Sequence, residues 1–157
     1  MARAWKIEGL NPDQFLKTSL PKILRLRFDE MWSYLDDTIE GKDVNPLHDM
    51  RVSARRLQAL LRIFRDALPK KKVDRQIKVI RDLVRHLGGV REHDVFLDAL
   101  LDYKKGRPDG DERSVDLMIA REKSLRVAEQ SALRRYLLHL RRAEYDHIFK
   151  DFVRDAT

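Results

Sequence analysis

The chain has 157 residues, no cysteine, and 33 Lys and Arg against 26 Asp and Glu, a net charge of +7. The lack of cysteine excludes a disulfide scaffold, a thiolate nucleophile and a Cys-ligated metal centre. This length suits one domain with its own hydrophobic core, so we expect residues 1–157 to form a single domain with a core at 12–150 and tails at 1–10 and 153–157. No signal-peptide core and no membrane-spanning stretch is evident, so we expect a cytoplasmic protein.

The excess positive charge lies in the middle of the chain. Residues 1–45 carry 7 basic and 8 acidic side chains, residues 46–107 carry 16 and 8, and residues 108–157 carry 10 and 10. Cations concentrated in one segment favour a binding surface for an anionic partner over a general aid to solubility.

The first helical pattern opens at Asn11-Pro12, an N-cap followed by proline at the first helical position, and continues to about Thr38. Pro21 can separate a short helix over 12–19 from the rest. Gly41-Lys42-Asp43 ends the pattern. The apolar positions recur at helical spacing: Leu20, Leu24, Met31 and Leu35.

Asn45-Pro46 repeats the cap and opens a second helix, which Pro69 stops. Its apolar positions alternate by three and four, as in a helix of a bundle: Leu47, Met50, Ala54, Leu57, Leu61, Phe64 and Leu68. A third helix continues the alternation: Val73, Ile77, Ile80, Val84 and Leu87. Gly88-Gly89 predicts a break in this third helix.

A helix resumes at about Glu92 and runs to Tyr103, and Gly106–Gly110 is the clearest loop. A long final helix is predicted from about Glu112 to Phe152, with these apolar positions: Val115, Ile119, Leu125, Leu133, Tyr136, Leu137 and Leu140. No stretch alternates with a period of two. We therefore predict an all-α fold, an antiparallel four-helix bundle with a broken third helix and a long C-terminal helix.

Cations follow the apolar positions of the second and third helices. One stripe of the second helix holds His48, Arg51, Arg55, Arg62 and Arg65, and contains no acid. On the third helix Lys78, Arg81 and Arg85 each follow an apolar position. If the two helices pack side by side, the stripes line one groove. A merely solvated face would more often mix charges of both signs at i,i+4.

Most of these cations are arginines, whose planar guanidinium bonds two phosphate oxygens at once. Arg56 lies on a different face, and either reaches the groove from its flank or forms a structural ion pair. Arg27 falls among the apolar positions of the first helix, so it must be paired or face a charged cavity. Arg25 and Lys22 are further candidates with weaker support from their helical phase.

His48 lies near a helix start, where free backbone N–H groups and the helix dipole favour an anion. An imidazole at that point can donate a hydrogen bond to such an anion. The alternative is a surface histidine without function.

Two blocks of sequence resemble one known family. The segment from Leu47 to Leu57, continuing to Phe64, resembles the signature helix of the CHAD (conserved histidine α-helical domain) family, His-x-x-Arg-Val-x-x-Arg-Arg-Leu. The segment from Arg81 to Val95 is similar to the family's Leu-Gly-x-x-Arg-Asp-x-Asp-Val element, with Glu92 in place of its first Asp. The resemblance covers about residues 12–150.

The resemblance implies an all-helical, non-catalytic domain whose basic cavity binds inorganic polyphosphate. It implies these binding residues: His48, Arg51, Arg55, Arg56, Arg81, Arg85 and Arg91. Asp94 would orient an arginine or cap the resumed helix. Family members usually contain two such bundles, whereas this chain has one set of signature blocks, so we expect a homodimer to supply the second. Polyphosphate granules are then an expected location. No Glu-x-Glu-x-Lys stretch occurs, so hydrolysis is not expected.

Two other functions are compatible with parts of the sequence. His48-Asp49-Met50-Arg51 resembles the phosphoacceptor box of histidine-kinase dimerisation helices, although the expected proline is absent. A basic stripe also suits nucleic acid, but it has no interleaved aromatic residue to stack bases, so only weak, non-specific binding is expected. No histidine pair has i,i+4 metal spacing, and we expect neither a metal nor a cofactor.

Overall fold

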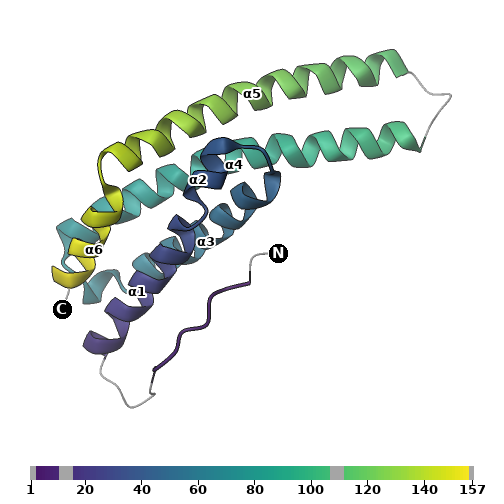
Figure 1. Cartoon of the computed structure of the whole chain (residues 1–157). Coiled ribbons are helices and arrows are strands. Elements are labelled where there is room, and N and C mark those ends of the chain that lie inside the picture. The colour runs from purple at the N-terminus through teal and green to yellow at the C-terminus, as the bar shows by residue number, and fades with distance from the viewer. Residues whose placement is uncertain (1–2, 11–15, 107–111, 156–157) are drawn as a thin grey trace.

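A computed structural model describes residues 3–10, 16–106 and 112–155 of the chain. Its helices are α1 (Leu16–Trp32), α2 (Leu35–Glu40), α3 (Val44–Ile63), a short 3-10 turn η1 (Arg65–Ala67), α4 (Lys70–Lys105), α5 (Glu112–Arg142) and α6 (Tyr145–Asp155) (Figure 1). The described residues contain no β-strand, so the all-α prediction is confirmed.

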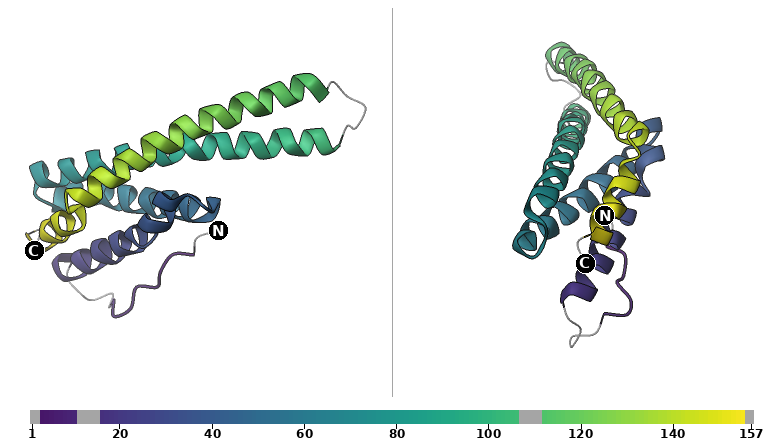
Figure 2. Two further views of the ribbon diagram at one scale, coloured as in Figure 1. Left: turned by 45° about the horizontal axis from the view of Figure 1, so that its top comes forward. Right: turned by 90° about the vertical axis from the view of Figure 1, so that its left-hand side faces the viewer.

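The helices form a bundle from which one hairpin projects. Helix α3 packs between α1 and α4, α4 packs along α5, and α6 turns back onto α1. Figures 1 and 2 show α4 and α5 continuing side by side beyond the other helices. We call this projecting part the arm, namely residues 95–105 of α4 and 112–125 of α5.

The predicted apolar positions form the main core almost without exception. Those of α3 are fully or nearly fully buried as far as Leu61. Phe28 and Phe149 add a ring stack whose centroids are 4.3 Å apart, and this joins α6 to α1. A separate small cluster in the arm holds Leu97, Leu100 and Ile119. The prediction was wrong at Leu125, which is exposed.

The predicted break at Gly88-Gly89 is wrong, because α4 is continuous from Lys70 to Lys105. Gly89 instead allows close approach of a neighbouring side chain, whereas a methyl group at Gly88 would make only ordinary contact. A Cβ at Gly88 would lie 3.9 Å from Nε of Arg51 on α3, and a Cβ at Gly89 would lie 2.7 Å from a carboxylate oxygen of Glu129 on α5. A glycine inside a helix costs about 0.5–1 kcal/mol relative to alanine, which the surrounding packing of α4 can offset.

The predicted long final helix is divided at Ala143 and Glu144. Glu144 has a φ of 51°, in the left-handed region, and this reverses the chain between α5 and α6. The turn lets Phe149 reach Phe28. Val153, predicted to begin a tail, is buried in α6, so the core extends past residue 150.

Two predicted helix starts also change. Pro21 does not split the first helix, since it lies inside α1 within two turns of its beginning, where few backbone hydrogen bonds are lost. Helix α3 is capped by Asp43 and not by Asn45: the Asp43 side chain accepts from the Asn45 backbone N–H at 3.0 Å, which lowers the pKa of Asp43. The Asn11-Pro12 cap and most of the Gly106–Gly110 loop lie outside the described residues.

Candidate anion-binding site

Helices α3 and α4 run antiparallel, and two contacts fix their register. Arg51 lies against Gly88, and Arg65, just past α3, pairs with Asp74 of α4. Interpolating between these contacts places Arg55 beside Arg85 and Arg62 beside Lys78. The cations of both helices therefore follow one line of contact. We call this set the basic junction: His48, Arg51, Arg55 and Arg62 of α3, and Lys78, Arg81, Arg85 and Arg91 of α4.

The cations of the junction differ in how they are neutralised. Arg55, Arg62 and Lys78 are exposed, and none of them forms an ion pair with a carboxylate in the described residues. Arg81 and Arg85 flank Asp82 at 4.0 and 3.8 Å, so one carboxylate serves two guanidiniums. The junction therefore keeps a net positive charge.

Arg65, also on the predicted stripe, is used differently. It donates through Nε and Nη2 to the two Asp74 oxygens at 2.7 and 2.9 Å. These hydrogen bonds lower the pKa of Asp74 and raise the pKa of Arg65. We therefore leave Arg65 out of the basic junction.

His48 and Arg51 present polar atoms that have no partner. Both side chains are half-buried, and Nδ1 of His48 and Nε of Arg51 are buried without a hydrogen bond in the described structure. A buried polar group left unpaired costs about 1–3 kcal/mol. A ligand that bonded these atoms would recover this cost, and an anion suits the charge of Arg51.

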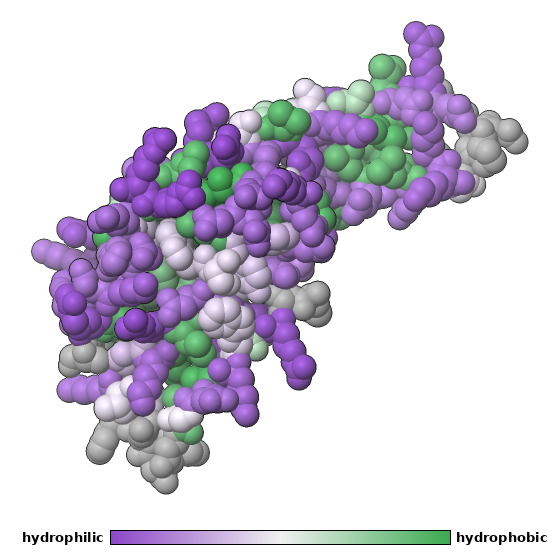
Figure 3. Space-filling view, in the orientation of Figure 1, coloured by the Kyte–Doolittle hydropathy of each residue, from purple (hydrophilic) through white to green (hydrophobic). Residues whose placement is uncertain are grey.

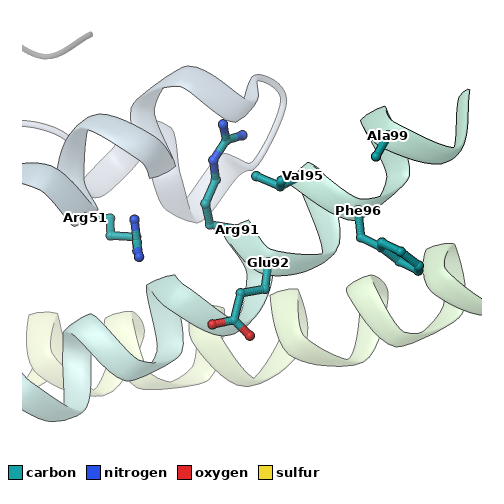
Figure 4. Close-up of a pocket in the computed structure, with 6 residues that line it drawn as sticks. All are labelled: Arg51, Arg91, Glu92, Val95, Phe96 and Ala99. Carbon is teal, nitrogen blue, oxygen red and sulfur yellow. The ribbon is translucent and has the colours of Figure 1, made fainter. Parts of the chain in front are cut away.

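A cavity of about 330 Å³ lies where α3 begins against α4. It is lined by Arg51 from α3 and by Arg91, Glu92, Val95, Phe96 and Ala99 from α4 (Figure 4). In Figure 4 the side chains of Arg91 and Glu92 point in opposite directions, with Arg91 extending away from α5. One wall of the cavity is thus cationic and another is apolar.

Arg27 and Arg56 meet at a buried carboxylate instead of at the basic junction. The side chain of Glu30 is 0 % exposed and accepts from Arg27 at 2.7 Å and from Arg56 at 3.2 Å. It also accepts from the Trp5 backbone N–H at 3.3 Å, so the expected N-terminal tail is attached to α1 here. Of the two alternatives for each arginine, the structure shows the ion pair.

Lys22 and Arg25 lie elsewhere. They line a different cavity, of about 480 Å³, between α1 and the N-terminal segment, together with the acids Glu8 and Asp29. Arg25 is also 3.9 Å from Asp29. The structure does not bring these two cations together with the basic junction.

Asp94 pairs with Arg126 of α5, a partner that the sequence did not reveal. The alternative role of capping a resumed helix is wrong, because no helix begins there. The neighbouring His93 lies 2.6 Å from Glu122, and His86 stacks on Tyr136 with ring centroids 4.7 Å apart. No group of three potential metal ligands occurs in the part of the chain that the structure describes.

Comparison with known proteins identifies one family. The model of the CHAD domain matches residues 22–156. No curated protein matches the chain, and neither does a solved structure. Of the helices in the described segments, none has the length and apolar content needed to cross a membrane.

Proposed function

This chain belongs to the CHAD domain family, and we propose that it binds inorganic polyphosphate, or a similar polyanion, along the basic junction without catalysing a reaction. The observation that carries the proposal is the pair of buried, unpartnered atoms of His48 and Arg51 beside cations that form no ion pair. We propose that the protein acts in the cytoplasm and associates there with polyphosphate granules.

The shape of the junction suits a linear polyanion. At about 1.5 Å per residue, the α3 positions from His48 to Arg62 extend over about 21 Å. Arg51 and Arg55 are about one turn apart on this line, and α4 supplies facing cations at Arg85 and Lys78. Successive phosphates of an extended chain could therefore bond to guanidiniums alternately from the two helices.

The carboxylate that contacts the junction favours binding over catalysis. Asp82 lies between two arginines, which suits a role in holding cations in place. We accordingly assign no acid–base role to the junction.

We also propose that the chain forms a homodimer, which contains two basic junctions.

Titration with polyphosphates of graded length tests the proposal. Arg55→Ala should weaken binding by about 1.5–3 kcal/mol, or about 10- to 150-fold. Arg65→Ala is the matched control, because its guanidinium is already bonded to Asp74, and it should change the affinity little. Equal losses for the two variants would contradict binding at the basic junction.

Duplex DNA is the second probe, since its phosphate backbone would also suit a basic surface. At an ionic strength of about 0.15 M, weak exposed contacts are screened, and long-chain polyphosphate should displace DNA. Displacement of polyphosphate by DNA would instead make the chain a nucleic-acid binder.

A further inference from the structure

The arm projects beyond α3, the helix that covers one side of α4 in the bundle. By the register of Arg51 with Gly88, the first residue of α3, Val44, lies beside Val95 of α4. From there onward the side of α4 that faces α3 in the bundle has no covering helix among the described residues. The cavity lined by Val95, Phe96 and Ala99 lies at the start of this uncovered side.

The arm leaves much apolar surface in contact with solvent. Its own core holds three residues, each still 7–9 % exposed. Figure 3 shows hydrophobic side chains gathered along the arm, whereas hydrophilic ones cover most of the bundle. The exposed apolar residues of the arm include Val95, Phe96, Leu101, Leu117, Met118 and Leu125, with Val95 52 % exposed. An exposed apolar surface of this kind is typical of an interaction site.

The charges on the uncovered side of α4 are arranged so that the surface complements itself. Arg91, Val95, Asp98 and Asp102 follow the spacing 4, 3, 4 and so share one helix face. The cation lies at one end and the two acids at the other. Among residues 3–10, 16–106 and 112–155, none of these three charged side chains forms an ion pair. An antiparallel copy of the same helix would place opposite charges together.

We propose that a second copy of this chain packs on the arm, α4 against α4, in antiparallel orientation. Val95 of each copy packs against Ala99 of the other, a larger side chain against a small one, and fills the cavity between α3 and the arm. This register brings Arg91 of each copy to within one residue of Asp102 of the other. A two-fold axis repeats both contacts, as in most homodimers.

This surface gives the location of the interface in the homodimer that the proposed function includes. In that respect the present proposal rests on the proposed function. The dimer would place the two basic junctions end to end on opposite sides of the two-fold axis, because Arg91 is the α4 member of the junction nearest to the interface. The charge pattern of Arg91, Asp98 and Asp102, on which the proposed dimer contact rests, does not depend on polyphosphate. The test therefore uses the protein alone, and a separate titration decides polyphosphate binding.

The experiment is a pair of charge reversals measured by sedimentation equilibrium. The unmodified chain should be a dimer, whereas Arg91→Asp and Asp102→Arg should each raise the dissociation constant by about tenfold or more, since like charges then meet at both ends. An equimolar mixture of the two variants should restore the dimer, because each mixed pair joins an arginine to an aspartate. The double variant Arg91→Asp/Asp102→Arg should also dimerise.

Arg121→Asp, a reversal on α5 away from the stripe, is the control and should leave the dimer intact. Circular dichroism of each variant checks that the helices form. A monomeric unmodified chain would overturn the proposal. A dimer that withstands both single reversals would show that the two copies pair through another surface. A mixture that stays monomeric would contradict the pairing of Arg91 with Asp102.

Discussion

Arg51 of α3 lies directly over Gly88 of α4, with its Nε 3.9 Å from the position that a Cβ at residue 88 would occupy. A methyl group at residue 88 would make only ordinary contact, so it is the absence of a larger side chain that leaves room for the arginine between the two helices, where its Nε is buried without a partner. The glycine thus acts on the basic junction through space and not through a bend in its own helix.

Substitutions of Gly88 should separate helix propensity from the placement of Arg51. A distance of 3.9 Å is ordinary contact, so Gly88→Ala should raise the free energy of unfolding by about 0.5–1 kcal/mol and leave polyphosphate affinity unchanged. Gly88→Leu should displace Arg51 and weaken polyphosphate binding. Urea unfolding and calorimetric titration measure the two quantities. A loss of stability in Gly88→Ala would mean that the helices cannot accept even a methyl group.

Arg51→Met should weaken polyphosphate binding without lowering the stability of the fold. Methionine keeps the side chain as far as the position of Nε but replaces this buried nitrogen, which has no partner, with a methyl group, so the free energy of unfolding of the ligand-free protein should be unchanged or higher. Polyphosphate affinity should fall, because a guanidinium is lost from the junction. Arg75→Met, on the exposed surface of α4, is the control for a general loss of charge. A destabilised Arg51→Met that binds polyphosphate normally would assign Arg51 a structural role.

The apolar positions were predictable because the spacing of three and four residues reports directly which face of a helix is buried. Positions from Leu47 to Leu61 needed no knowledge of the neighbouring helices. Gly88 and Gly89 were misread because a local rule treats paired glycines as a break, whereas here their role depends on side chains of α3 and α5. The turn at Glu144 has neither glycine nor proline beside it, so the sequence carried no signal for it.

In the candidate site, too, helical spacing was predictable from the sequence, whereas contacts between helices were not. Helical phase was enough to align the cations of α3 and α4, since both stripes lie beside buried positions. It could not show that Asp74 neutralises Arg65, or that Glu30 holds Arg56 from 26 residues away, because such pairs depend on tertiary packing. Lys22 and Arg25, which had weaker support from their helical phase, lie in a different cavity.

Removing the charge of Glu30 should destabilise the fold strongly. In Glu30→Gln the guanidiniums of Arg27 and Arg56 would lose their shared carboxylate in a buried setting, at a cost of about 3 kcal/mol in the free energy of unfolding. Asp36→Asn is the matched control, because its pair with Arg141 is exposed and should matter little. Urea unfolding of both variants provides the comparison, and similar losses would show that the Glu30 network is not a principal support of α1 and α3.

His86 should make the stability of the fold sensitive to mild acid. Burial against Tyr136 lowers the pKa of His86; Arg85 lowers it further, and Glu129 and Asp82 oppose the shift. Burial also raises the pKa of Tyr136 to about 12, so the phenol stays neutral at any pH used here. Because the unfolded chain binds a proton at His86 more readily than the folded one, stability should fall as the pH drops below about 6.5.

His86→Phe keeps the ring stack but cannot bind a proton, so it should lose less stability than the unmodified chain between about pH 7.5 and about pH 5.5. His147→Phe is the control, since His147 is exposed on α6 and away from this contact. The free energy of unfolding in urea at the two pH values gives the difference directly. If the unmodified chain and His86→Phe decline in parallel, the acid sensitivity over this range belongs to groups other than His86. Asp43 and Asp74 are not among them, because their lowered pKa values reduce stability only near and below the ordinary aspartate pKa of 3.8.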